Sequence, residues 1–124
     1  MKNLIPKTGT SINEWRSKVL IPYVVERENF VCWKPECYNR ASDVHEALYS
    51  RNDVRGWDWN RKVLIHTPYN CIALCRDCHK NSIPDKEDVL DWMLDEYGIV
   101  VLDWCEGLPF VINPLATLLE RKRL

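Results

Sequence analysis

Hydrophobic residues recur at helical spacing in the first part of the chain. Ser11 or Asn13 can cap a helix at its start. The hydrophobic residues lie three or four positions apart, and they are Ile12, Trp15, Val19 and Tyr23. This spacing predicts a helical region over residues 12–29. Pro22 interrupts the pattern, so we expect a kink or a junction of two helices there.

A second periodic segment begins at Pro84–Asp85, a typical helix start, and ends at Gly98. Its hydrophobic positions predict an amphipathic helix, and they are Val89, Leu90, Trp92, Met93 and Tyr97. A last helix is expected after Asn113–Pro114, over Leu115, Leu118 and Leu119.

Several shorter runs favour extended structure. We expect strands or strand-like segments at Phe30–Trp33, within Ala41–Tyr49, at Val63–His66 and at Ile99–Trp104. Cys71–Leu74 leads into a cysteine pair, and a short helix is expected to begin near Arg76. Residues 50–62 show no clear period, which indicates an exposed loop with some helical turn.

The composition indicates one globular domain over residues 1–124, since 46% of the residues are hydrophobic and 28% are charged. No secretion signal or membrane span is recognisable, so we expect a cytoplasmic protein without membrane contact. The net charge of −1 is unevenly distributed. Residues 1–80 carry 13 Lys or Arg against nine Asp or Glu, and residues 81–124 carry four against nine. A nucleic-acid surface would therefore lie on the first two-thirds of the chain, although two ordinary solvated faces explain the charges equally well.

Four cysteines occur as two closely spaced pairs, Cys32 with Cys37 and Cys75 with Cys78. In a cytoplasmic chain this spacing favours metal binding over disulfides, and four thiolates suit tetrahedral Zn²⁺. A site made only of cysteines leaves no position for water, so this zinc is expected to be structural. Cys71 and Cys105 lie in apolar runs and are expected to be small core residues.

Two histidines and a glutamate accompany the cysteine pairs. His79 directly follows Cys78, while His45 and Glu46 lie between the pairs, so folding around the zinc should bring them together. Histidines and a carboxylate around one point form an open site for a divalent metal that can hydrolyse a phosphodiester. For His66 we favour a structural role or one close to phosphate.

These residues resemble the HNH, or ββα-metal, nuclease family. The resemblance covers Trp15 to Asn81 and is most specific in Asn70-x4-Cys75-x2-Cys78–His79. It implies an α+β fold with a ββα-metal, treble-clef-like core over residues 30–81, a structural zinc knuckle, and flanking helical regions at 12–29 and 82–124. It also implies that His45 and His79 bind the catalytic metal, that Glu46 stands at the position of the base, and that Asn70 braces the loop.

Glu46 departs from the family pattern, in which this position is usually histidine. A glutamate is a weaker base by about two pKa units. Either burial raises its pKa, or the roles are exchanged, with His45 as base and Glu46 as ligand. Successive strand residues point to opposite faces, so both can reach one site only at a bulge or a strand end.

The basic residues after Glu46 could contact DNA phosphates, and they are Arg51, Arg55, Arg61 and Lys62. The sequence thus predicts a metal-dependent DNA endonuclease of low sequence specificity, which cleaves both strands or acts as a nickase. By analogy, its small size suggests a phage or mobile-element enzyme, acting in the cytoplasm of a bacterial or phage-infected cell. Histidine ligands favour Mn²⁺, Ni²⁺ or Zn²⁺, and Mg²⁺ is possible. The alternative is a non-catalytic zinc module that binds nucleic acid or a protein.

Overall fold

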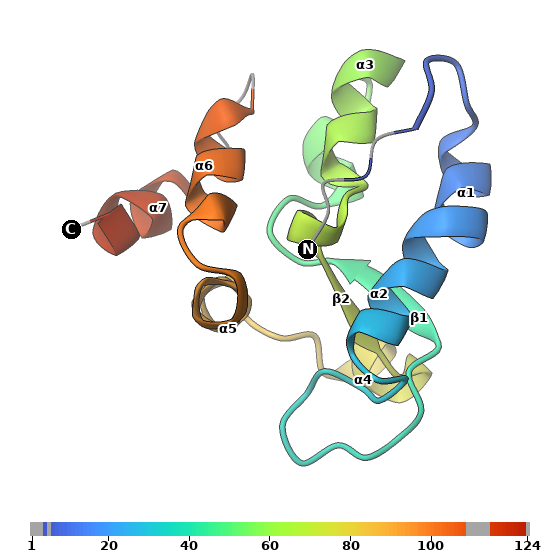
Figure 1. Ribbon diagram of the computed structural model, residues 1–124, viewed down its shortest axis with the longest axis vertical. Coiled ribbons are helices and arrows are strands. Elements are labelled where there is room, and N and C mark those ends of the chain that lie inside the picture. Colours follow the sequence, from blue (N-terminus) through green and yellow to red (C-terminus); the bar gives the residue numbers. More distant parts are fainter. Residues whose placement is uncertain (1–3, 5, 109–114, 124) are drawn as a thin grey trace.

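The computed structural model describes residues 4, 6–108 and 115–123 and shows an α+β fold (Figure 1). Helices dominate, and the described strands form one two-stranded sheet. Helices α5, α6 and α7 lie together on one side, and α1, α2 and the sheet lie on the other. Within the described ranges, no helix has both the length and the apolar character needed to cross a membrane.

The N-terminal helical region has three consecutive parts, namely α1 (Ile12–Trp15), a π-helical turn (Arg16–Leu20) and α2 (Ile21–Arg27). The hydroxyl of Ser11 begins it by accepting a hydrogen bond of 3.3 Å from the backbone N–H of Glu14. Pro22 lies in the first turn of α2, directly after the π-helical turn. Proline has no N–H to donate, and its ring would clash with the carbonyl of the preceding turn, so a wider turn before Pro22 relieves that clash. The expected junction at Pro22 is confirmed.

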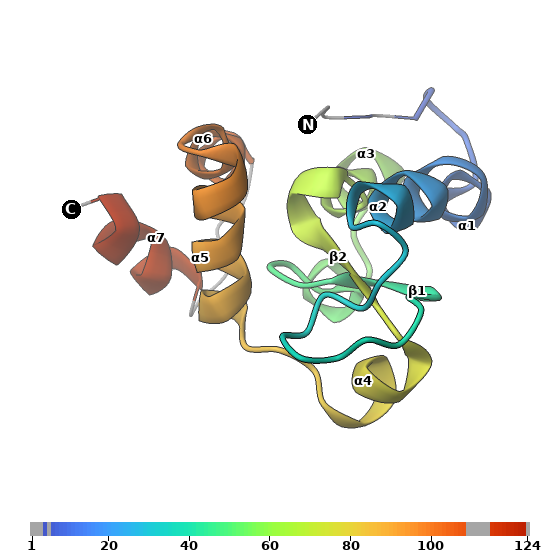
Figure 2. The same cartoon turned by 60° about the horizontal axis from the view of Figure 1, so that its bottom comes forward.

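The sheet pairs β1 (Asp43–Glu46) antiparallel with β2 (Cys71–Leu74). Asp43 lies opposite Leu74, and Glu46 lies opposite Cys71. Because side chains alternate along a strand, Asp43 and His45 share one face while Val44 and Glu46 share the other. Helix α2 covers the second face, where Leu20, Val24, Val44, Cys71 and Ala73 form a small core. Figure 2 shows α4 (Arg76–Asn81) at the opposite side of the sheet from α1 and α2.

The segment between β1 and β2 carries short helical pieces: η2 (Arg51–Val54), α3 (Trp59–Lys62), η3 (Val63–Ile65) and η4 (Pro68–Asn70). The predicted loop with helical turns over residues 50–62 is confirmed. The strand predicted at Val63–His66 is wrong, because its first three residues form a 3-10 turn that buries Val63 and Ile65.

The C-terminal part contains α5 (Lys86–Tyr97), α6 (Val100–Gly107) and α7 (Leu115–Arg123). Gly98 ends α5 with a φ of 78°, a left-handed conformation that glycine adopts without strain. The predicted amphipathic helix is confirmed, with Val89, Leu90 and Met93 fully buried. The strand predicted at Ile99–Trp104 is wrong, since these residues begin α6 and bury Val101 and Leu102. The cap predicted at Asn113–Pro114 lies outside the described residues.

Candidate functional site

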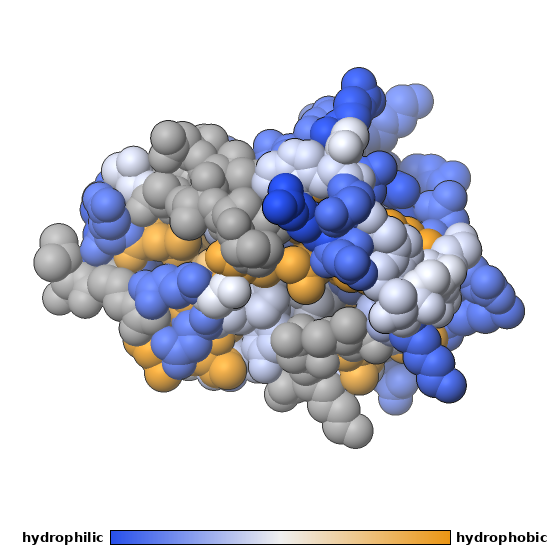
Figure 3. All heavy atoms as spheres, turned by 90° about the horizontal axis from the view of Figure 1, so that it is seen from above, coloured by the Kyte–Doolittle hydropathy of each residue, from blue (hydrophilic) through white to orange (hydrophobic). Residues whose placement is uncertain are grey.

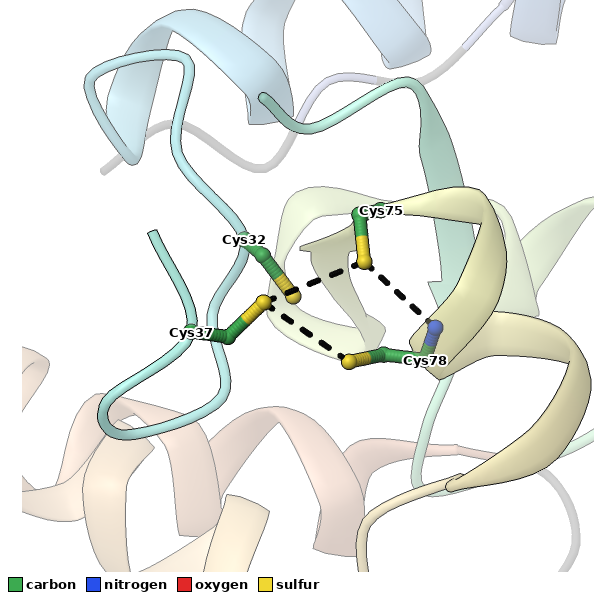
Figure 4. Close-up of side chains that lie close together, drawn as sticks. All are labelled: Cys32, Cys37, Cys75 and Cys78. Atoms are coloured by element: carbon green, nitrogen blue, oxygen red, sulfur yellow. Dashed lines mark hydrogen bonds between the residues drawn. The ribbon is translucent and has the colours of Figure 1, made fainter. Parts of the chain in front are cut away.

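The four cysteines of the two pairs meet at one point between the loop over residues 31–40 and the start of α4 (Figure 4). The loop that carries Cys32 and Cys37 is held by backbone hydrogen bonds from Cys32 to Asn39 and from Cys37 to Lys34. The sulfurs of Cys37 and Cys75 are 3.9 Å apart, and those of Cys37 and Cys78 are 3.8 Å apart. Within the described residues, this is the one group of three or more cysteine, histidine or carboxylate side chains whose donor atoms all lie within 4.8 Å of one another. These four side chains can hold a metal ion.

Helix α4 helps to prepare this cluster for a cation. Cys75 is its N-cap, and its sulfur accepts the backbone N–H of Cys78 at 3.4 Å. This hydrogen bond lowers the pKa of Cys75 to about 6, which favours the thiolate that metals require. Burial raises the pKa of Cys78 to about 12 in the absence of a cation. Cys71 and Cys105 are fully buried elsewhere in the core.

A second group of polar side chains lies where β1 meets α4. His79 Nδ1 is 2.9 Å from Asp43 Oδ2, and the rings of His45 and His79 are 5.3 Å apart. The structure therefore brings together His45 and His79, as the sequence predicts. It adds Asp43, which sequence reasoning missed because only the adjacent pair His45–Glu46 was considered. The alternation of side chains along a strand would have selected Asp43, two residues before His45.

Electrostatic interactions distinguish the members of this group. Burial raises the pKa of Asp43, but hydrogen bonds from His79, Ser42 and Arg76 outweigh it, so the carboxyl pKa lies below its usual value. The pKa of His45 is also lowered, mainly by burial and then by the neighbouring His79. Near neutral pH, this face thus presents an ionised carboxylate beside an uncharged His45 imidazole.

Glu46 lies on the opposite face of β1, away from His79. Its Oε1 accepts a hydrogen bond of 2.8 Å from Arg16 Nε and lies 3.2 Å from His66 Nδ1. Burial raises the pKa of Glu46, but His66 and Arg16 outweigh it and lower the pKa. The side chain is buried, so neighbouring protein groups surround this carboxylate on most sides.

Asn70 is fully buried and connects the two ends of the segment between the strands. Its side-chain oxygen accepts backbone N–H groups of Leu48 and Tyr49 at 3.1 and 2.8 Å. Its amide donates to the carbonyls of Tyr49 and Ile65 at 2.9 and 2.8 Å. Asn70 therefore fixes the backbone that follows His45 and Glu46 without reaching the His45–His79 face itself.

Three of the four predicted DNA-contacting cations line one cavity of about 290 Å³, namely Arg51, Arg55 and Lys62. Buried His66 also lines it, which places the Glu46–His66 pair beside the cavity. Arg61 is not among its lining residues, and its guanidinium lies 5.9 Å from the ring centre of Trp57. Seen from above, hydrophilic side chains gather over the region of α3, while hydrophobic residues show on the side of α6 and α7 (Figure 3).

The chain was also compared with known proteins. No family model, no curated protein and no solved structure matches it. The geometry described above therefore has to carry the functional interpretation, and it contains two separate features: a cysteine cluster that can hold a metal ion, and a neighbouring face with one carboxylate and two imidazoles.

Proposed function

We propose that this protein is a metal-dependent DNA endonuclease whose catalytic centre consists of Asp43, His45 and His79. The observation that carries the proposal is the half-exposed face on which His79 Nδ1 lies 2.9 Å from Asp43 Oδ2, with the ring of His45 at 5.3 Å from that of His79. The resemblance of Asn70–His79 and of Val44–Glu46 to the HNH motif supports the nuclease class and His79 as a ligand, but it implies His45 as a ligand and Glu46 as the base, so the roles of Asp43 and His45 rest on the geometry.

The donor set fits a catalytic divalent ion. Asp43 and His79 would hold it, because a carboxylate oxygen and an imidazole nitrogen are ligands that Mn²⁺, Ni²⁺ and Zn²⁺ accept, and both side chains are partly exposed. When bound, such an ion stabilises the negative charge that develops on the phosphate and on the leaving oxygen during hydrolysis.

His45 is the proposed base. Its pKa is lowered by burial and by His79, so its imidazole is neutral near pH 7 and can accept a proton from the attacking water. Glu46 is less suited, because its carboxylate is already bound by Arg16 and lies beside His66. We assign Glu46 to positioning: it holds His66 at the wall of the basic cavity, where Arg51, Arg55 and Lys62 would contact backbone phosphates.

We further propose that the cysteine cluster holds a structural zinc ion. Four sulfurs at about 2.3 Å from a tetrahedral ion lie about 3.8 Å from one another. The distances of 3.8 and 3.9 Å that separate Cys37 from Cys78 and Cys75 agree with that geometry. The ion would fix Cys78 and therefore the position of His79, the next residue along α4.

The proposal is tested by nicking of supercoiled plasmid in Mn²⁺ or Mg²⁺. Asp43→Asn and His79→Ala should each reduce the rate by at least about 100-fold, since both remove a metal ligand. Asp77→Asn is the matched control, because Asp77 is exposed on the same helix and, among the residues that the structure describes, accepts a hydrogen bond from Asn81 alone. If wild type never nicks DNA with any divalent ion, or if His79→Ala nicks as fast as wild type, the proposed centre is wrong.

Metal titration separates the base from the ligands. His45→Ala should lose nicking but keep its Mn²⁺ affinity within a few-fold, whereas His79→Ala should lose both. Isothermal titration calorimetry on the zinc-loaded protein measures that affinity directly. A large loss of Mn²⁺ affinity in His45→Ala would make His45 a ligand and leave the base to be found elsewhere.

The second candidate is a non-catalytic zinc module that binds nucleic acid through the basic cavity. One observation favours it: unlike the cysteines, Asp43, His45 and His79 do not form a group whose donor atoms all lie within 4.8 Å. Plasmid binding without nicking under any divalent ion, combined with about one zinc per chain by elemental analysis, would support this candidate.

A further inference from the structure

A cavity of about 490 Å³ lies away from the proposed catalytic face. It is formed where the cysteine-bearing loop meets the start of α5, and its lining includes two tryptophans and three aspartates, namely Trp33, Trp92, Asp85, Asp88 and Asp91. The ring centres of Trp33 and Trp92 are 5.9 Å apart, and the rings are nearly perpendicular, with an angle of 87°. The cavity therefore combines an aromatic wall with a carboxylate rim.

The charges of this cavity are only partly neutralised. Lys122 pairs with Asp91, and Lys34, the cation in the lining, donates to the hydroxyl of Ser82. Asp85 and Asp88 are exposed, and among the described residues neither has an ion-pair partner. The surrounding residues 81–124 are acidic as a whole, with nine Asp or Glu against four Lys or Arg. Lys34 keeps its charge when it donates to a neutral hydroxyl, so a cation entering the cavity would meet two unpaired carboxylates and one ammonium.

The tryptophan in the wall already binds a cation within the protein. The guanidinium of Arg27 lies 5.6 Å from the ring centre of Trp92, at a smaller neighbouring cavity that Trp92 also lines. Aromatic faces attract guanidinium groups through the negative potential of the ring, and the attraction increases where water is partly excluded. Trp92 therefore lines two cavities. The larger one combines aromatic and acidic groups that suit the guanidinium of another protein.

We propose that this cavity binds an arginine side chain of a basic segment in a partner protein. The carboxylates of Asp85 and Asp88 supply the charge complement, and Trp33 and Trp92 supply the flat surface. A nucleic acid would be repelled by the three aspartates. The proposal concerns a surface apart from the nuclease centre and does not depend on the proposed catalysis.

The test uses the zinc-loaded protein with an acetylated, amidated Arg-Gly-Arg-Gly-Arg peptide, without DNA. Binding is followed by nuclear magnetic resonance of the six tryptophan indole N–H signals, which Trp33→Phe and Trp92→Phe assign. We expect saturable shifts at Trp33 and Trp92. The double variant Asp85→Asn/Asp88→Asn should weaken binding by roughly tenfold or more.

The matched control is Asp95→Asn, which removes an exposed carboxylate of α5 that does not line the cavity. It should bind the peptide as wild type does, and a Gln-Gly-Gln-Gly-Gln peptide should not bind. Equal weakening in Asp95→Asn, unchanged binding in the double variant, or no saturable binding would each overturn the proposal. If a DNA duplex shifts the same two indole signals, the occupant is nucleic acid and the proposal is wrong. If dilution of the protein alone shifts them, the occupant is a second copy of the chain, which also overturns the proposal.

Discussion

The amide of Asn70 makes four hydrogen bonds to backbone groups that lie on both ends of the β1–β2 connection. Asn70→Ala would leave these buried groups unpaired, and the free energy of unfolding should fall by about 3 kcal/mol or more. Urea unfolding measures the change, with Asn60→Ala, an exposed position in α3, as the control. A loss as small as that of Asn60→Ala would contradict the bracing role.

Cys105 is a fully buried thiol on α6, and burial raises its pKa from 9.0 to about 12. Its folded pKa is therefore higher than its unfolded pKa, so its contribution to stability is complete below about pH 9 and is lost as the pH rises toward 12. The free energy of unfolding should fall over this range, and it should fall less in Cys105→Ala. Urea titrations at several pH values, with a reductant present, provide the comparison. Parallel curves for both proteins would exclude the effect.

At the residue scale, the sequence predicted site residues only where their chemistry depends on close spacing along the chain. The spacing of the cysteines predicted the cluster, because chelating spacing is local and its chemistry is specific. Asp43 has no such signature by itself, and only the alternation of side chains along the strand expected within Ala41–Tyr49 would have placed it beside His45. Arg16 was missed for the same reason: it reaches Glu46 across 30 residues of sequence.

At the scale of elements, caps and periodic hydrophobic positions predicted the helices well. Ser11, Pro84 and Gly98 mark helix ends through the conformation and hydrogen bonds of their own and adjacent residues, so the sequence alone indicates these ends. Ile99–Trp104 was wrongly predicted as a strand because isoleucine and valine generally favour strands. In the structure, Val101, Leu102 and Cys105 lie on one face of α6 and pack into the main core. Packing against α5 decides this segment, and no local pattern contains that information.

The cysteine cluster joins the loop over residues 31–40 to the start of α4. Chelation of the proposed zinc ion should therefore increase amide hydrogen exchange mainly at 31–40 and 75–81, and much less within α5, whose Val89, Leu90 and Met93 remain buried. Exchange followed by mass spectrometry resolves these segments, and chelator saturated with Mg²⁺ is the control. Uniform acceleration along the chain would show that the metal holds the whole fold and not these two elements.

The whole molecule separates its charges between two cavities. One is lined by Arg51, Arg55 and Lys62, and the other by Asp85, Asp88 and Asp91. Such a division would let DNA and a basic protein segment bind at the same time, since each surface repels the other's ligand. The uneven charge of the sequence fitted a nucleic-acid surface and two ordinary solvated faces equally well, and it did not indicate that charged side chains line cavities.

The proposed binding of DNA at the basic cavity should depend on the salt concentration. The logarithm of the association constant should fall linearly with the logarithm of the salt concentration, and Arg55→Gln should reduce the slope by about 0.9 because one phosphate contact is lost. Arg121→Gln is the control, since Arg121 lies 3.6 Å from Glu87 on the other side of the protein. Fluorescence anisotropy with a labelled duplex measures both slopes. Equal slopes for Arg55→Gln and wild type would remove Arg55 from the interface.

The four hydrogen bonds of Asn70 also bear on how this protein could change in evolution. They hold the two ends of the β1–β2 connection together whatever lies between them, and doubling the length of a flexible loop costs only about 0.6 kcal/mol of closure entropy. Insertions at the exposed tip near Gly56 should therefore leave β1, β2 and α4 in place. New contacts to nucleic acid could be acquired there while the residues at the sheet stay unaltered.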